Sequence, residues 1–143
     1  QWNTIFYYVN QSYNKRYIEE TFGEINANIF VSEATYKMGK GKSLRFEAQL
    51  LATNDDRKNW AGGTVEYNAT SKLAVYINDI YNYGNDDVDQ QIHYYNVGGS
   101  YTVGVHRFTL NYGRQRGGLI CIGGVCRNVP ESSGVSLSLN TSF

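Results

Sequence analysis

The sequence predicts an all-β protein, an antiparallel transmembrane β-barrel of eight strands with short periplasmic turns and longer extracellular loops. Residues 134–143 alternate strictly between apolar and polar side chains and contain neither charge nor proline. The chain has 13 Tyr and 15 Gly but one Pro, a composition that favours strands and tight turns over helices. The connections between the predicted strands alternate between short and long, with both chain ends on the short-turn side, as in outer-membrane barrels.

The length and the net charge of the chain limit the classes of protein to which it can belong. The 143 residues make one domain, residues 1–143, and the net charge of zero provides no basic surface for nucleic acid. The mean hydropathy is −0.47 and the sequence lacks the long apolar run that a transmembrane helix needs. A lipid-spanning barrel has such a mean value because half of its strand positions face a polar interior.

The first predicted strand, residues 2–13, carries aromatic side chains on both faces, which leaves its register open. The second, residues 22–36, has apolar side chains such as Ile25 and Ile29 on one face and Glu24 on the other. After a short glycine-rich turn, the third and fourth strands repeat the alternation over residues 43–53 and 61–69. A second short turn leads to the fifth, residues 72–81.

The last three predicted strands have the same alternation of side chains between two faces. Residues 92–103 and 107–115 alternate apolar with small or polar side chains, and Gly104-Val105 forms the tight turn between them. Residues 116–133 are expected to form a long loop before the closing strand, 134–143. The side chains that we expect to face lipid are Ile25, Ile29, Leu44, Phe46, Val65, Val75, Phe108, Leu110, Leu137 and Leu139.

Aromatic residues gather near the ends of the predicted strands, as the interfacial girdles of a membrane barrel require. Tyr is also a good strand former, so this second explanation stays open. The aromatic positions concerned are Trp2, Tyr36, Trp60, Tyr67, Tyr81, Tyr83, Tyr95, Tyr101, Tyr112 and Phe143.

Charged residues on the polar faces of the strands predict a network inside the barrel. An eight-stranded barrel is only wide enough for side chains to fill, and a charge buried there must be paired. We therefore expect the network to plug the lumen; gaps in it would instead leave a narrow ion path. Its predicted members are Glu24, Arg45, Glu47, Glu66 and Arg107.

Cys121 and Cys126 enclose two glycines in the long loop before the last strand. Glycine permits the backbone conformations that a small disulfide loop needs, and an extracellular loop is an oxidising place. A metal site would need more ligands than the sequence offers nearby, and residues 85–89 lack the glycine and the glutamate of an EF-hand. We expect a disulfide, no cofactor and no metal. The sequence has no nucleophile motif, so we expect no enzyme.

The chain from Arg107 to Phe143 resembles the C-terminal part of an uncharacterised family of Gram-negative outer-membrane β-barrel proteins. The shared features are Gly-Arg-Gln-Arg at 113–116, Cys-Ile-Gly-Gly-Val-Cys-Arg at 121–127 and a last strand ending in Phe. The resemblance implies a barrel in the outer membrane and supplies no activity. Members of that family are considerably longer, so residues 1–143 form either a complete barrel or the last eight strands of a larger one.

The sequence thus predicts an integral outer-membrane protein with a structural or interaction role. Its expected partners are the lipid bilayer, the barrel-assembly machinery during insertion, and another protein at the outer loops or an open edge strand. A pore or transport barrel completed by further strands is the first alternative, and a soluble ligand-binding β-barrel with its apolar side chains inside is the second. The last strand resembles the signal that the assembly machinery reads, at Val135, Leu137, Leu139 and Phe143.

Overall fold

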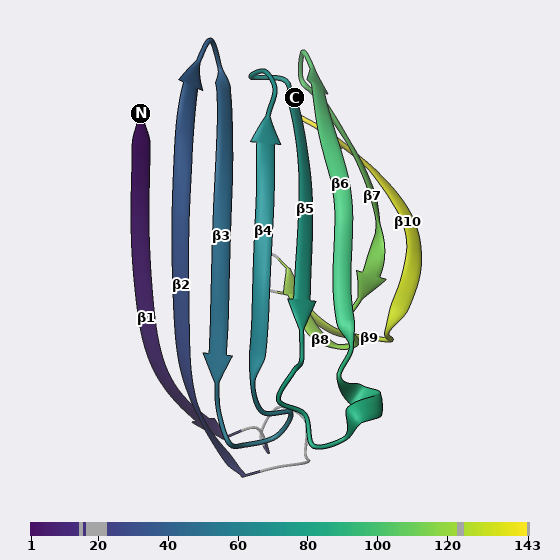
Figure 1. The fold of residues 1–143 in the computed structure, drawn as a ribbon. Helices are drawn as coiled ribbons and strands as arrows, with labels where there is room; N and C mark the ends of the chain where they lie inside the picture. The colour runs from purple at the N-terminus through teal and green to yellow at the C-terminus, as the bar shows by residue number, and fades with distance from the viewer. Residues whose placement is uncertain (15, 17–22, 123–124, 143) are drawn as a thin grey trace.

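The computed structural model describes residues 1–14, 16, 23–122 and 125–142, with the backbone alone for 118–122 and 125–129. Eight antiparallel strands form one sheet in the order β1-β2-β3-β4-β5-β6-β7-β10, which confirms the predicted antiparallel arrangement and, for this sheet, the predicted number of strands (Figure 1). The strands are β1 (Trp2–Asn14), β2 (Glu24–Gly39), β3 (Lys42–Ala52), β4 (Trp60–Asn68), β5 (Leu73–Tyr81), β6 (His93–Val103), β7 (His106–Gln115) and β10 (Ser132–Thr141).

Short turns connect the strands at one end of the sheet, and the longer connections lie at the other end together with a short 3-10 helix, η1 (Val88–Gln90) (Figure 1). Gly39, Lys40 and Gly41 all have positive φ at the turn between β2 and β3. In the two-residue turn between β6 and β7, Gly104 has a φ of 58°, the conformation that a tight hairpin requires of its first central residue. The chain termini lie at the short-turn end.

The sheet is open. In the described residues β1 pairs with β2 alone and β10 pairs with β7 alone, so the chain does not close into the predicted eight-stranded barrel. Strands β1 to β4 lie almost side by side, whereas β6, β7 and β10 bend away from the viewer in Figure 1. The result is a curved wall with a concave and a convex side.

A hairpin of β8 (Gly118–Ile122) and β9 (Val125–Val129) lies on the concave side, behind β4 and β5 in Figure 1. The sequence predicts a long loop at these positions, and the structure has a hairpin instead. The signal for a hairpin was present, because β-branched and other apolar residues flank a Gly-Gly pair, the residue pair that two-residue hairpin turns favour.

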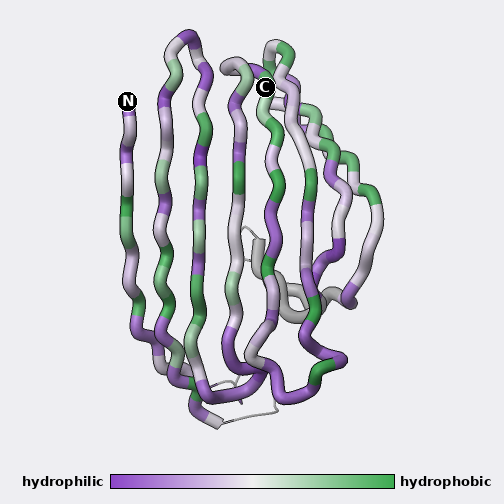
Figure 2. The backbone as a smooth tube through the Cα atoms, in the orientation of Figure 1, coloured by the Kyte–Doolittle hydropathy of each residue, from purple (hydrophilic) through white to green (hydrophobic). Residues whose placement is uncertain are grey.

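The register divides the side chains between two faces, because directly paired residues in neighbouring strands point to the same side of a sheet. One face, named the convex face here, carries Leu137, Leu110, Val75 and Phe46. The opposite face, named the concave face, carries Arg45 and the polar residues between these positions. Figure 2 shows the resulting alternation of hydrophobic and hydrophilic positions along the strands and the hydrophilic long connections at the lower end.

The apolar side chains are the more exposed set. Leu110 is 55% exposed on the convex face and Leu137 is 74% exposed, whereas the Glu47 side chain on the concave face is 24% exposed. A soluble protein has the opposite distribution, with apolar side chains in the interior. The convex face is therefore an uncovered apolar surface made of one sheet.

Two of the side chains expected to share the face of Phe46 do not. Ile25, which is 3% exposed, and Ile29 lie on the concave face, and Glu24 lies on the convex face opposite Asn14. The prediction is wrong for β2 because the register shifts by one residue between Lys37 and Gly39, at a bulge before the turn into β3. A one-residue shift moves the whole side-chain set of a strand to the opposite face.

Candidate functional site

The concave face holds one arginine surrounded by three glutamates. Arg45 on β3 lies 2.8 Å from Glu47 and 3.2 Å from Glu33 through its Nη1 atom, and 3.3 Å from Glu66 through its Nη2 atom. The register explains the arrangement, since Arg45 is directly opposite Glu66 on β4 and Glu33 on β2 is directly opposite Glu47. One guanidinium therefore neutralises parts of three carboxylates.

Neighbouring polar groups orient the carboxylates of this network. Asn68 donates a hydrogen bond of 2.9 Å from its Nδ2 to Glu66, and the hydroxyl of Thr35 donates one of 3.5 Å to Glu33. The four charged side chains of the network are between 24% and 30% exposed, so water reaches them. With one positive and three negative charges, the network gives this part of the concave face a negative potential.

The structure brings together Arg45, Glu47 and Glu66 of the predicted network. Glu24 lies on the other face, and Arg107 lies on the concave face of β7, where its Nη2 donates a 3.1 Å hydrogen bond to the Ser100 hydroxyl. The ion pairs of the Arg45 network all lie on three neighbouring strands, and in the described residues none crosses to an opposite wall.

Sequence reasoning missed Glu33. This residue continues the alternation that begins at Ile25 and Ile29, the set that is expected from the sequence to face lipid. The available signal was the glutamate itself, because a carboxylate in the middle of a lipid-facing row is costly and indicates that the row faces inward.

A chain of hydrogen bonds between polar side chains, called the relay here, crosses the concave face from β5 to β10. The Tyr76 hydroxyl donates a hydrogen bond to Oδ1 of Asn111 on β7, and the Asn111 Nδ2 in turn lies 3.5 Å from the Ser136 hydroxyl on β10. The Tyr76 ring reaches across β6 at Gly98, where a Cβ atom would lie 2.9 Å from the Tyr76 Cζ. The absence of a side chain at position 98 lets the relay form.

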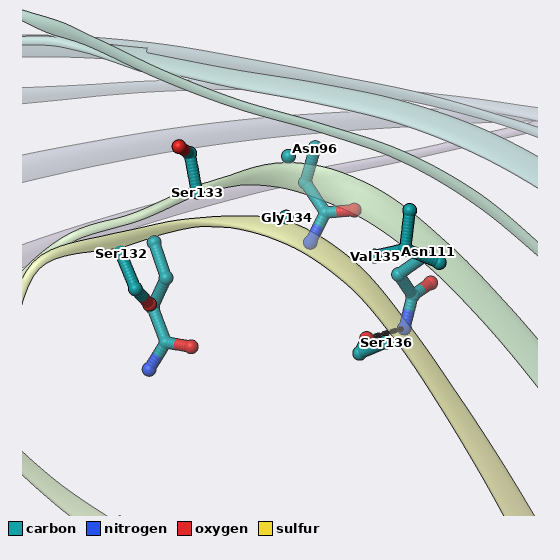
Figure 3. A pocket seen from close by; sticks show the side chains of 9 residues that line it. Asn96, Asn111, Ser132, Ser133, Gly134, Val135 and Ser136 are labelled. Carbon is teal, nitrogen blue, oxygen red and sulfur yellow. Dashed lines mark hydrogen bonds between the residues drawn. The ribbon is translucent and has the colours of Figure 1, made fainter.

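A polar recess lies beside this relay at the β10 edge of the sheet, with a volume of about 240 Å³ (Figure 3). It is lined by amides and hydroxyls without a charged side chain, and Oδ1 of Asn96 is buried with no hydrogen-bond partner among the described residues. Such a lining suits water or a neutral polar solute. The lining residues are Asn96, Asn111, Gly113, Gln115, Ser132, Ser133, Gly134, Val135 and Ser136.

The stem of the β8–β9 hairpin packs on two buried aromatic rings of the concave face. The Arg116 guanidinium lies 4.5 Å from the centre of the Trp60 ring, and that ring stacks at 6.1 Å on Tyr94. On the other side of the hairpin, Glu131 accepts a 3.2 Å hydrogen bond from the Tyr94 hydroxyl and a 2.7 Å hydrogen bond from Nε of Arg114. Both ends of the hairpin are thus fixed to the sheet.

Trp60 was expected in an interfacial girdle, but its side chain is 8% exposed and lies on the concave face under the hairpin stem. Two other aromatic pairs lie on the convex face, and each defines one row. Trp2 and Tyr36, 4.7 Å apart between ring centres, form the upper row, and Tyr8 and Phe30, 4.9 Å apart, form the lower row. The two rows lie six residues apart along β1 and β2, or roughly 20 Å.

The side chains of Cys121 and Cys126 lie outside the described part of the structure. The backbone register places the two residues directly opposite one another, one pair away from the turn of the β8–β9 hairpin. The disulfide itself stays a prediction.

Among the described residues, the structure has no helix that is long and apolar enough to cross a membrane. No group of three or more His, Cys, Asp or Glu side chains in the same part of the chain is arranged to hold a metal ion. Comparison with curated proteins and with solved structures finds no match. A family model described as a family of unknown function, DUF6029, matches residues 1–143, and the chain therefore belongs to this family.

Proposed function

We propose that this chain forms the wall of an outer-membrane β-barrel, with the convex face in the lipid and the concave face lining the lumen. The observation that carries the proposal is the inverted distribution of exposure. Apolar side chains such as Leu110, at 55%, are more exposed than the ion-paired Arg45 on the other face, at 29%. Lipid is the solvent that makes this distribution favourable.

The two aromatic rows support the same orientation. Tyr and Trp prefer the membrane interface because their rings are apolar and their polar groups can stay hydrated. The apolar positions between the rows would lie in the hydrocarbon region. On the same face, a carboxylate oxygen of Asp79 lies 2.7 Å from Nδ1 of His93 near the Tyr8–Phe30 row, where a polar pair stays close to water.

The proposed role is structural or interactive, without catalysis. A soluble ligand-binding barrel would need its apolar residues on the concave face, where the register instead places Arg45, Glu47 and Glu66. The hairpin and the long connections at one end would form the extracellular surface through which a protein partner is bound.

A pore is the second candidate function, and the geometry of the Arg45 network favours it over a plug. A plug requires contacts between opposite walls, whereas the described contacts of Arg45 stay on β2, β3 and β4. An excess of carboxylates on the lumen wall would favour the passage of cations. Conductance in a planar bilayer, with a reversal potential measured in a salt gradient, tests this role.

A disulfide between Cys121 and Cys126 belongs to the same proposal. In a hairpin with a two-residue turn, the pair next to the residues flanking the turn is a non-hydrogen-bonded pair, whose Cα atoms are about 4.5 Å apart. This separation falls within the range that a disulfide spans, about 4.4–6.8 Å. The bond would fix the tip of the hairpin.

Quenching by brominated lipids tests the orientation of the wall. Leu137 and Ser136 are neighbours on opposite faces of β10, so Leu137→Trp and Ser136→Trp form a matched pair in a Trp2→Phe background. In vesicles containing lipids with brominated acyl chains, the added fluorescence of Leu137→Trp should be quenched and that of Ser136→Trp should not. Stronger quenching at position 136, or water solubility of the folded chain without detergent, would contradict the proposal.

A further inference from the structure

The polar recess on the concave face owes its shape to two paired glycines. Gly113 on β7 lies directly opposite Gly134 on β10 and, on its other side, directly opposite Asn96 on β6. A Cβ atom at position 113 would lie 2.8 Å from the Asn96 Cα, so the close approach of the two strands requires that glycine. A Cβ atom at position 134 would meet no atom within 4 Å, and the φ of Gly134 is not positive. Packing therefore does not require glycine at 134, and its effect is to leave the recess open.

The amides that line the recess offer hydrogen-bonding groups that the described residues do not satisfy (Figure 3). Oδ1 of Asn96 is buried without a partner among the described residues, and such an acceptor costs free energy until a donor arrives from solution. Oδ1 of Asn111 accepts the hydrogen bond of Tyr76, which leaves the Asn111 Nδ2 as a donor, and this atom lies 3.5 Å from the Ser136 hydroxyl.

Hydroxyl groups match this pair of amides. A hydroxyl group both donates and accepts hydrogen bonds, so it can donate to the Asn96 Oδ1 or accept from the Asn111 Nδ2. The two residues occupy diagonal positions of adjacent strands, whose Cα atoms are about 7–8 Å apart. A solute with several hydroxyl groups can therefore reach both amides at once.

The size and the charge of the recess narrow the class of solute further. Its volume of about 240 Å³ is several times the share of one water molecule in the liquid, about 30 Å³. One polyhydroxyl solute replaces several ordered waters, each of which would lose entropy separately. No charged side chain lines the recess, so an ion bound there would lose hydration without gaining a counter-charge.

We propose that the recess binds a neutral polyhydroxyl solute of about the size of one sugar ring, through the amides of Asn96 and Asn111. The inference rests on the proposed function, in which the concave face lines a water-filled lumen. It gives the two ends of the polar wall different roles. The Arg45 network on β2 to β4 would attract cations, whereas the recess on β6, β7 and β10 would hold neutral solutes.

Saturation-transfer NMR on the folded chain in detergent micelles, with glucose as the probe, tests the site. Asn96→Leu removes the unpaired acceptor, and Gly134→Val fills the recess from a position where an added Cβ has free space. Ser138→Val places the same side chain on the concave face of β10 outside the recess and is the matched control. We expect the affinity for glucose to fall by about tenfold or more in Asn96→Leu and Gly134→Val, and to stay within about twofold in Ser138→Val.

Glucuronate and protonated glucosamine keep the ring of glucose and add a negative or a positive charge. We expect both to bind more weakly than glucose by about tenfold or more. Equal affinity for the three probes, unchanged glucose affinity in Gly134→Val, or no glucose signal with the natural chain would each overturn the inference. If Asn96→Leu does not fold, Gly134→Val and Ser138→Val carry the comparison. Failure of glucose binding leaves lipid quenching at Leu137 and Ser136 unaffected, so the orientation of the wall is tested separately.

Discussion

The ring of Tyr76 lies against Gly98, and a Cβ atom at position 98 would stand 2.9 Å from the Tyr76 Cζ. This contact lets the Tyr76 hydroxyl reach Asn111 on the strand beyond and connects β5 to β7 across β6. The glycine therefore has a steric role in the concave face.

Gly98→Ala should weaken the wall because the added methyl group displaces either the Tyr76 ring or the Asn111 amide. We expect a loss of about 1–3 kcal/mol in the free energy of unfolding in detergent, as for other overpacked sites. Gly63→Ala is the matched control, since a Cβ there meets its nearest atom at 3.7 Å. Equal stability of the two variants would show that Tyr76 adapts without cost.

Arg45→Leu should destabilise the chain more than Arg107→Leu. Removing Arg45 leaves three half-buried carboxylates without their shared cation, whereas Arg107 donates a hydrogen bond to the neutral Ser100 hydroxyl. Hydrogen bonds to charged groups contribute about 1.5–3 kcal/mol each, so a difference of about 2 kcal/mol is expected in denaturant unfolding. Rescue of Arg45→Leu by Glu47→Gln would confirm that unpaired negative charge causes the loss.

Leu110→Arg should cost about 2–4 kcal/mol in lipid, because Leu110 is 55% exposed on the convex face, where in the proposed orientation a charge meets hydrocarbon. Thr109→Arg places the same side chain at the neighbouring position on the concave face and should cost much less. Reversible unfolding from lipid vesicles measures both. A larger penalty at position 109 would mean that the convex face is covered by protein or by water.

Glu131→Ala should release the stem of the β8–β9 hairpin, because it removes the acceptor shared by Tyr94 and Arg114. Amide hydrogen exchange in residues 118–129 should accelerate by about tenfold, which corresponds to about 1.4 kcal/mol, with little change in β2 and β3. Ser138→Ala, on the free edge of the same sheet, is the control. Uniform acceleration along the chain would indicate global destabilisation.

Cys121 and Cys126 should resist alkylation until a reductant is added, and reduction should raise the mass of the chain by two hydrogens. The cross-strand register of the two residues supports this expectation. Alkylation of both thiols in the protein isolated under oxidising conditions would contradict it.

Strand positions could be predicted closely because alternation is a local property, and the expected and observed bounds of β5 and β7 differ by one residue at most. The assignment of β2 to a face failed for a reason that is not local. Alternation separates the set of Ile25 from the set of Glu24, but only the register with β3 decides which set accompanies Phe46, and the bulge after Lys37 reverses that choice.

The same distinction between local and non-local information holds for the functional groups. Arg45 and Glu66 could be predicted as partners because both occupy polar positions of adjacent strands. The relay over Gly98 could not be predicted, since it depends on a ring crossing an intervening strand. The hairpin was not predicted because the spacing of the two cysteines is typical of a small disulfide loop, although the residues around Gly123-Gly124 are typical of strands.

The open edge of β10 should also affect whether the chain aggregates before it folds. Ten consecutive uncharged positions with alternating Ser and Leu or Val resemble a template for fibril growth when they meet water. If the chain is delivered to the outer membrane as proposed, we therefore expect it to depend on a holding chaperone on the way, and a delay in delivery should produce β-rich aggregates in which β10 is the segment protected from proteolysis.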